Sequence, residues 1–345
     1  MDFPHLLRNL KNLSRLDLSN NKIHGPIPNW LISIRWDSLE FLNLSHNSLT
    51  GHIEQLYYPN LKFLDLKFNF LQGQLPSSIC KLKNPTLLDL SHNNFSESIP
   101  YCLGSMTWLT VLDLRRNNFS RSLPPLCTQS TSLYTISLNG NQFKGPIPLS
   151  LLNCTDLEVL DMGNNAINVT FPAWLGTLEE LQVLIVKLNK FHGPISIRQK
   201  FCFPKLRVFD LSHNEFSGLL PSEVFQNFKA MTKNGTNKGS IRYMKLQFTG
   251  SFSDSIMYKD SIRLEIKDQE IELERIPTIM TTIDLSSNHF EGVIPKTLKD
   301  LGSLRLLNLC RNNLRGDIPL EMGQLNRLDG LDLSWNWLTG MIPQI

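Results

Sequence analysis

The chain has 345 residues, of which 41% are hydrophobic and 19% are charged, and its formal net charge at pH 7 is +3. So small a net charge argues against a nucleic-acid-binding arm and against a surface that attracts acidic substrates. No apolar run approaches the length of about 18 residues that a membrane span needs, and the first residues lack the basic and apolar segments of a signal peptide.

A motif returns about every 24 residues along the chain. One copy consists of Leu66, Asn69, Leu71, Gly73 and Leu75-Pro76, and another consists of Leu309, Asn312, Leu314, Gly316 and Ile318-Pro319. A period of roughly 20 to 29 residues with L-x-x-L-x-L-x-x-N spacing indicates a leucine-rich-repeat solenoid. Such a solenoid presents a long concave face, which binds macromolecules more often than it performs chemistry.

The repeat asparagines set the register, and we count twelve of them: Asn21, Asn47, Asn69, Asn93, Asn117, Asn141, Asn165, Asn189, Asn214, Asn288, Asn312 and Asn336. Each L-x-L segment is predicted to be a short strand, and the strands are predicted to form one parallel sheet on the concave face. Each asparagine amide is predicted to bond to the backbone of the tight turn around it.

One step in the register is long, from Asn214 to Asn288. We therefore predict nine repeats over residues 1–221, an island insertion over residues 222–280 and three repeats over residues 281–345. Within the island, residues 225–231 suit a helical turn, while residues 261–267 and 271–273 alternate as strands do. A long ordered insertion of this kind is usually functional.

The Gly-x-Ile-Pro ending of the repeats resembles the plant-specific class of leucine-rich repeats. Four stretches extend the likeness, namely residues 16–25, 157–165, 228–231 and 278–288. Through them the chain resembles the ectodomain of plant receptor-like proteins of the tomato Cf disease-resistance type. The chain carries neither end cap, so we expect it to be a piece of a longer array.

That resemblance implies a recognition module on the extracellular face of the plasma membrane, acting in plant defence. Its partners would be a protein or peptide ligand and, since the family has no kinase, a receptor-kinase adaptor and a co-receptor. Nucleic acid and cofactors are not expected. The alternatives are a non-signalling receptor fragment, or a soluble inhibitor or structural protein like the polygalacturonase-inhibiting proteins, although those have cysteine caps and no island.

No catalytic or metal-binding motif accompanies the repeats, so we predict that the chain is not an enzyme. The histidines of the Ser-His-Asn triplets are interpreted as part of the repeat, at His46, His92 and His213. An aspartate column at the outward strand position is interpreted as a solvated ladder that limits edge association, at Asp17, Asp65, Asp89, Asp113, Asp161, Asp210, Asp284 and Asp332.

Six cysteines allow 15 disulfide connectivities. Cys80 and Cys102 have similar phase in successive repeats, and so do Cys102 and Cys127, so stacking leaves both pairings open. The resemblance favours the first pair. It also places a cysteine near Pro172-Ala173-Trp174, where this chain has none, which would leave Cys154 unpaired. Cys310 is expected to be a solvent-facing thiol beside a concave strand.

Glycosylation sequons are candidates for modification at Asn12, Asn94, Asn118, Asn153, Asn168 and Asn234. Asn43 also heads a sequon, but it would project from the centre of the concave face.

Ligand contacts are expected where outward positions depart from the repeat pattern, because exposed aromatic and arginine side chains carry most interface energy. On the concave face these positions are Lys67, Phe68, Arg115, Arg116, Tyr134, Asn139, Ile185, Lys187, Leu188, Arg311 and Trp335. The island is expected to fold over one rim, near Lys187, Arg207 and Arg311. Its expected contacts are Tyr258, Lys259, Asp260, Ser261 and Lys267, of which the first four resemble a family segment.

Overall fold

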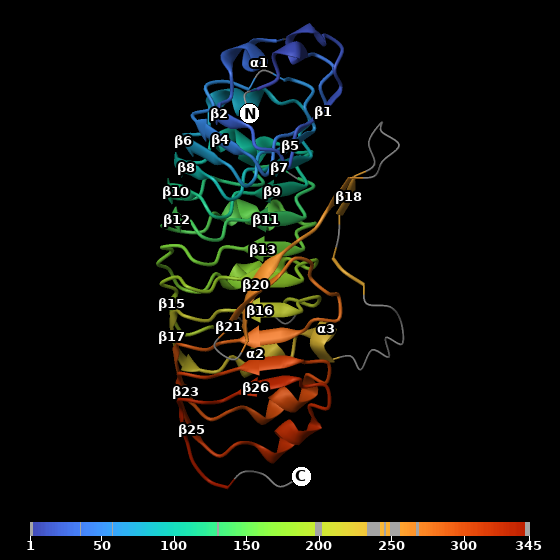
Figure 1. Cartoon of the computed structure of the whole chain (residues 1–345). Coiled ribbons are helices and arrows are strands. Elements are labelled where there is room, and N and C mark those ends of the chain that lie inside the picture. Colours follow the sequence, from blue (N-terminus) through green and yellow to red (C-terminus); the bar gives the residue numbers. More distant parts are fainter. Residues whose placement is uncertain are drawn as a thin grey trace. The chain divides into compact units, whose positions relative to one another are not determined.

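The computed structural model describes residues 3–34, 36–56, 58–129, 131–196, 202–232, 242–244, 246–248, 256–266 and 269–341. The chain, whose elements are labelled in Figure 1, divides into two compact units, Met1–Pro172 and Ala173–Ile345. Each unit is a stack of leucine-rich-repeat coils. None of the helices in the described ranges has the length and apolar character that crossing a bilayer requires.

The first unit carries one short strand per coil, and these strands pair in parallel and in chain order. They are β1 (Arg15–Asp17), β3 (Phe41–Asn43), β5 (Phe63–Asp65), β7 (Leu87–Asp89), β9 (Val111–Asp113), β11 (Thr135–Ser137) and β13 (Val159–Asp161). The register follows the repeat, so Leu64 pairs with Leu42 on one side and with Leu88 on the other. The strands predicted from the L-x-L segments are confirmed here.

A second parallel sheet in this unit follows the asparagine turns, where we had predicted only turns. Its strands are β2 (His24–Pro26), β4 (Ser48–Gly51), β6 (Phe70–Gly73), β8 (Asn94–Glu97), β10 (Asn118–Arg121) and β12 (Gln142–Phe143). Side chains alternate along these strands, and the inward ones are buried, as Leu49, Leu71 and Phe95 show. That alternation is a strand signal that the sequence prediction lacks.

Several coils then turn at a proline and enter a short helix, whereas residues 51–56 and 122–129 contain no helix. The helices of the first unit are η1 (His5–Asn9), α1 (Asn29–Ser33), η2 (Ser77–Lys81), η3 (Tyr101–Ser105) and η4 (Leu149–Asn153), where η marks a 3-10 helix. Pro76 precedes η2 at φ −68° and ψ 142°, an extended conformation that its ring favours and from which the helix begins.

The amides of the repeat asparagines, which are buried or half-buried in most coils, tie each coil to its neighbours. Asn93 donates from Nδ2 to the carbonyls of Leu66, Leu90 and Ser91 at 2.9, 3.2 and 3.1 Å, and its Oδ1 accepts from the Leu71 N–H at 3.0 Å. The predicted bonds to the local turn are therefore confirmed. The bonds to Leu66 and Leu71 reach the preceding coil, so one side chain satisfies backbone groups of two repeats.

We predict that Asn93→Ala lowers the free energy of unfolding by about 2 kcal/mol, because it leaves several backbone groups without partners. Asn94 is the matched control, since it is adjacent in sequence but its side chain is exposed. Chemical denaturation of both variants checks the prediction. Equal losses from Asn93→Ala and Asn94→Ala would contradict it.

The second unit repeats this plan. Its parallel strands are β14 (Val183–Ile185), β16 (Val208–Asp210), β22 (Thr282–Asp284), β24 (Leu306–Asn308) and β26 (Gly330–Asp332). The sheet after the asparagine turns holds β15 (His192–Gly193), β17 (Glu215–Leu219), β23 (His289–Gly292), β25 (Asn313–Gly316) and β27 (Trp337–Leu338). The 3-10 helices are η5 (Ala173–Thr177), η6 (Lys296–Asp300) and η7 (Leu320–Gln324).

The helical turn predicted for residues 225–231 is present as α2 (Ser222–Phe225) and α3 (Lys229–Thr232), but it belongs to the coil stack. Phe225, Phe228 and Met231 are fully buried, and the Met231 carbonyl accepts from the Ser303 N–H of a later coil at 2.8 Å. Residues 222–232, which we predict to be the start of the island, therefore pack with the repeat coils.

Two antiparallel hairpins make up the described part of the island. One joins β18 (Leu246–Phe248) to β19 (Ile256–Tyr258), and the other joins β20 (Ile262–Ile266) to β21 (Gln269–Leu273). The second hairpin confirms the two strands predicted from alternation. The chain rejoins the repeats beside the bridge between Tyr243 and Pro277, where the Met244 N–H donates to the Ile276 carbonyl at 2.8 Å.

Candidate functional site

The surface that carries most of the predicted ligand contacts is formed by the outward side chains of the parallel strands and of the turns after them. We call this surface the strand face of each unit. The outward positions of one coil of the first unit are Lys62, Phe63, Asp65, Lys67 and Phe68, while the leucines between them are buried inward.

The aspartate column of the strand face is buried in most coils, so our interpretation of a solvated ladder is wrong. Asp65, Asp89 and Asp113 are 5%, 2% and 0% exposed. Each accepts a hydrogen bond from the backbone N–H two residues later, as Asp89 does from Ser91 at 3.1 Å. These aspartates close local turns, and their neighbours in adjacent coils then shield them from water.

Two predicted ligand contacts, Lys67 and Arg115, form ion pairs with the aspartate column. The Lys67 ammonium lies 3.2 Å from Asp65 and 3.4 Å from Asp89, and the Arg115 guanidinium lies 2.6 Å from Asp113. Burial, followed by the charge of Asp89, raises the pKa of Asp65 to about 7 despite the Lys67 ammonium. Lys67 and Arg115 therefore stabilise buried carboxylates, which limits what they can offer to a ligand.

The residue just before each repeat asparagine adopts a left-handed backbone conformation. In the first unit φ is 53° at His46, 52° at Phe68 and 52° at Arg116, and in the second it is 53° at Leu188, 53° at Arg311 and 55° at Trp335. Residues with a Cβ adopt this region at a cost of roughly 1–2 kcal/mol, which Gly140 in the same position avoids. We call these positions the left-handed column of each unit.

Five predicted ligand contacts stand in the left-handed column, although we had not recognised the column from the sequence. They are Phe68, Arg116, Leu188, Arg311 and Trp335. Phe68, Leu188 and Trp335 are 42%, 41% and 78% exposed. Large side chains held in a costly conformation and turned to solvent are a reason to suspect function at these positions.

Phe68 lies between two imidazole rings that we had interpreted as part of the repeat. Its ring centroid is 4.5 Å from that of His46 and 3.9 Å from that of His92, and both pairs are stacked. Burial, together with the nearby Lys67 charge, lowers the pKa of His46, which favours neutral imidazole in the stack. The three rings form a partly exposed aromatic platform on the first strand face.

The remaining predictions for the first strand face concern Tyr134 and Asn139, which are both half-buried. Asn139 donates from Nδ2 to Asp161 at 3.3 Å, so it too supports the aspartate column.

In the second unit, Ile185 and Lys187 are covered, and our prediction that they contact ligand from an open face is wrong for this arrangement. Ile185 is 0% and Lys187 is 3% exposed. The Lys187 ammonium donates to the carbonyl of Arg263 in β20 at 2.9 Å and lies 3.9 Å from Asp210. Figure 1 shows β20 in front of the repeat strands at this level. Sequence alternation could not reveal a cover supplied by residues so distant in the chain.

The aspartate column of the second unit is also buried near this hairpin. Asp210 and Asp284 are register partners on β16 and β22 and are 0% and 4% exposed. Burial, followed by the charge of Asp210, raises the pKa of Asp284 to about 8, and burial also raises the pKa of Asp210. Lys187 therefore joins the hairpin to a pair of carboxylates that cannot easily both be charged.

The island contacts the strand face at Lys187 and Arg207, two of the three residues near which we expect it, while the contact expected near Arg311 stays a prediction. The Arg207 guanidinium donates to the carbonyl of Thr278, where the chain rejoins the repeats. Among the predicted island contacts, Tyr258 and Asp260 are buried at 7% and 3%, so they are wrong as open contact residues. Lys259 is exposed and Ser261 is half-buried, while Lys267 lies outside the described residues.

The cysteines form two disulfides in the described ranges. Cys80 pairs with Cys102 and Cys127 pairs with Cys154, with Cα separations of 5.5 and 5.6 Å. The expectation of an unpaired Cys154 is therefore wrong, because stacking of successive coils brings it within reach of Cys127. Cys310 is 5% exposed, so the expected solvent-facing thiol is wrong as well, since the coils on either side enclose it.

The sequon asparagines differ in their surroundings. Asn12, Asn94, Asn118, Asn153 and Asn168 are exposed, and Asn153 also donates to the Cys127 carbonyl at 3.0 Å. Asn234 lies outside the described residues. The Asn43 side chain lies within the strand face, where it accepts a hydrogen bond from the Ser45 N–H at 3.0 Å. This agrees with leaving Asn43 out of the candidate glycosylation sites.

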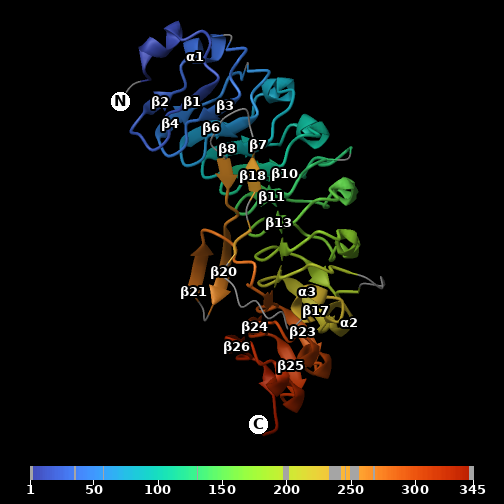
Figure 2. The ribbon, with the colours of Figure 1, turned by 90° about the vertical axis from the view of Figure 1, so that its right-hand side faces the viewer.

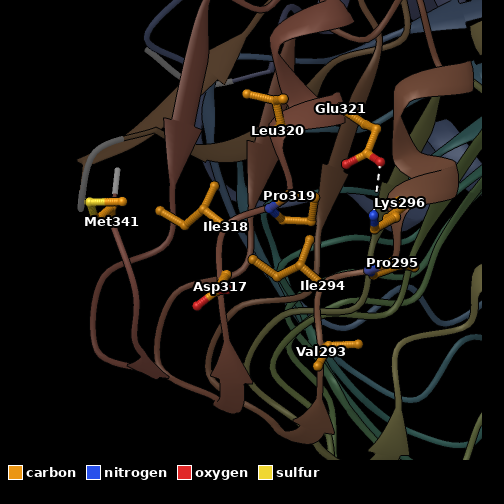
Figure 3. A pocket seen from close by; sticks show the side chains of 10 residues that line it. All are labelled: Val293, Ile294, Pro295, Lys296, Asp317, Ile318, Pro319, Leu320, Glu321 and Met341. Carbon is orange, nitrogen blue, oxygen red and sulfur yellow. Dashed lines mark ion pairs between the residues drawn. The ribbon is translucent and has the colours of Figure 1, made fainter. Parts of the chain in front are cut away.

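A groove of about 1010 Å³ runs along the flank of the last described coils of the second unit (Figure 3). Its residues come from successive Ile-Pro turns and the helices after them, and they are Val293, Ile294, Pro295, Lys296, Asp317, Ile318, Pro319, Leu320, Glu321 and Met341. The ion pair between Lys296 and Glu321 at 3.0 Å spans two coils beside it. The groove holds none of the predicted contacts.

Known families match the chain over most of its repeats. The model described as "Leucine Rich Repeat" matches residues 12–34, 38–57, 60–82, 84–106, 108–130 and 205–227, and a second one, "Leucine rich repeat", matches residues 280–338. Receptor-like protein 18 of Arabidopsis thaliana is 39% identical over 309 residues, and Receptor-like protein 7 is 45% identical over 334. These alignments cover 88% and 89% of this chain but 33% and 34% of the relatives, so the chain spans about a third of their length.

Solved structures of plant receptor ectodomains share the fold. The Arabidopsis receptor kinase HAESA, in complex with the peptide hormone IDA and the co-receptor SERK1, superposes with a TM-score of 0.74 at 27% identity, over 99% of this chain and 53% of that one. The plant peptide hormone receptor RGFR1, in complex with RGF2, gives a TM-score of 0.72 at 26% identity, over 98% and 50%. With these matches and its repeat architecture, the chain belongs to the leucine-rich-repeat family and is similar to plant receptor-like proteins over about a third of their length.

Proposed function

We propose that this segment is an extracellular recognition module that binds a peptide or protein ligand on its strand faces. The observation that carries the proposal is the left-handed column, where Phe68, Arg116, Arg311 and Trp335 keep large side chains in a backbone conformation that glycine or asparagine would adopt more cheaply. The peptide complexes of the structurally similar receptor ectodomains support the same class of function.

In this proposal the parent receptor acts at the plant plasma membrane, in defence, and signals through a receptor-kinase adaptor and a co-receptor. Among the island contacts that the structure describes, Lys259 is exposed beside the buried Tyr258 and Asp260, and Ser261 is half-buried. Glycans at Asn12, Asn94, Asn118 and Asn168 would leave the strand faces free, since these side chains lie outside the strands of those faces.

Substitution by glycine in the left-handed column tests whether these side chains serve ligand binding rather than folding. We expect Arg116→Gly, Arg311→Gly and Trp335→Gly to leave the thermal unfolding midpoint near that of the wild type, because relief of about 1 kcal/mol of backbone strain offsets the greater freedom of glycine in the unfolded chain. Phe68→Gly also loses the stacking on His46 and His92, so we expect a modest decrease in its midpoint. The same variants, in the full-length receptor in leaf cells, should lose about 10-fold in sensitivity to the peptide fraction of extracellular fluid from infected leaves.

Asn164→Gly is the matched control, because Asn164 occupies the same column at φ 49° with a small side chain. It should leave sensitivity unchanged. The proposal fails if the four variants fold normally, accumulate normally and respond like the wild type.

A further inference from the structure

The hairpin β20–β21 leaves one strand edge open to solvent. Within the described residues, the two-stranded sheet contains β20 and β21 alone, so each strand has a free edge. Figure 2 shows β21 farther from the repeat strands than β20. The edge of β20 is turned to the repeats, because the Arg263 carbonyl accepts from Lys187 at 2.9 Å. The edge of β21 is therefore the open one.

The register shows which backbone groups β21 presents at this edge. Antiparallel pairs alternate between hydrogen-bonded and non-hydrogen-bonded, and in the latter both residues point their N–H and C=O away from the partner strand. Arg263 is opposite Glu272, and its carbonyl is directed toward Lys187. Ile266 is opposite Gln269, and the residues that flank a two-residue hairpin connection ordinarily form a hydrogen-bonded pair. Counting along the strands from that pair also makes Arg263 and Glu272 a non-hydrogen-bonded pair. The N–H and C=O of Glu272 and Glu270 thus face outward.

The charges on β21 decide what can pair with that edge. Glutamate stands at positions 270, 272 and 274, and Glu272 and Glu274 are exposed. Glu272 has one basic partner, Arg263 of β20, at 2.5 Å. A second copy of the same strand would bring glutamates opposite glutamates, which is unfavourable. An extended segment with alternating basic residues would instead pair its backbone with the edge and its charges with the glutamates.

We propose that β21 is a docking edge for an extended basic peptide segment, which it takes up as an added third strand. Backbone hydrogen bonds to Glu270 and Glu272 supply the binding, and the exposed side chains of Glu272 and Glu274 select a basic partner. The exposed Ile271, at 39%, offers an apolar contact on the other side of the strand. This site is separate from the strand faces and does not require that a ligand binds there.

The experiment titrates the intact chain with a synthetic peptide of four Lys-Val repeats and follows hydrogen exchange of residues 269–273. We expect protection of β21 on binding, and no protection from a peptide of four Glu-Val repeats. Glu272→Pro removes one outward N–H at an edge, where proline is tolerated, and should weaken binding about 10-fold. Glu272→Gln keeps the backbone and removes the charge, and should weaken binding about 3-fold at low salt.

Three results would overturn the proposal. They are no binding of the basic peptide, binding without protection of β21, and equal affinities of Glu272→Pro and Glu272→Gln. A basic peptide with N-methylated backbone amides should fail to bind, which checks strand pairing even if Glu272→Pro disturbs the hairpin. The double variant Phe68→Gly and Trp335→Gly should bind the basic peptide like the wild type, so failure of this site and failure of the strand-face proposal remain distinguishable.

Discussion

Replacing Lys187 with methionine is expected to detach the hairpin β20–β21 from the strand face of the second unit. The lysine ammonium holds the Arg263 carbonyl at 2.9 Å and lies 3.9 Å from Asp210, with only 3% of the residue exposed. Methionine is an unbranched side chain only one atom shorter than lysine, but it cannot donate a hydrogen bond, and it leaves the buried Asp210 carboxylate without this cation. Breaking a buried pair in this way costs on the order of 3 kcal/mol.

Hydrogen exchange of residues 262–273 measures the effect. We expect exchange at these amides to accelerate at least about 10-fold in Lys187→Met, since the loss exceeds 1.4 kcal/mol, while exchange in β24 and β26 stays near wild type. Lys190→Met is the control, because Lys190 is a nearby exposed lysine. If both variants exchange at the wild-type rate, Lys187 is not what holds the hairpin.

Acidification from pH 8 to pH 5 is expected to stabilise the second unit. Burial and the charge of Asp210 raise the pKa of Asp284 to about 8, far above its unfolded value of about 4. The folded chain therefore keeps this proton where the unfolded chain has lost it. The resulting stability is fully present below about pH 4 and is lost as the pH rises through about 8. Between pH 5 and pH 8 the free energy of unfolding is expected to fall by an amount on the order of 3 kcal/mol.

Asp284→Asn should remove most of this pH dependence without disturbing the fold. Asn308 already occupies the equivalent position in the next coil, where its Oδ1 accepts from the Cys310 N–H at 3.1 Å. Thermal or chemical unfolding of the wild type and the variant across this range gives the comparison. A wild type that grows more stable toward pH 8, or a variant with the same slope, would contradict the buried-pair explanation.

The repeat register could be predicted from the sequence because each coil contacts mainly its neighbours. The spacing of Leu64, Leu66 and Asn69 already determines which side chains point inward, so the strands and the asparagine ladder followed from it. The aspartate column was misinterpreted for a related reason. Alternation places Asp89 outward, but it does not reveal that Ser91 closes a turn onto it or that adjacent coils shield it.

Contacts between distant parts of the chain could not be predicted from the period. Alternation predicts that Ile185 points outward into solvent, yet it is fully buried. On the same strand face, Lys187 bonds to Arg263, which lies 76 residues further along the chain. The left-handed column was different, because its signal was present in the sequence. The residue immediately before each repeat asparagine occupies this position. Phe68 and Trp335 are predicted as contacts because they are aromatic and depart from the repeat pattern, and not because of their backbone conformation.

Site-specific photocrosslinking in the full-length receptor tests the central claim most directly. A photoreactive phenylalanine analogue would replace Phe68 or Trp335 on the strand faces, or Tyr101, which is 76% exposed on the helix η3. The receptor would be irradiated in leaf cells with the peptide fraction of extracellular fluid from infected leaves. We predict a peptide adduct at Phe68, Trp335 or both, and none at Tyr101. An adduct at Tyr101 alone, or none at any position while the receptor still responds, would contradict recognition on the strand faces.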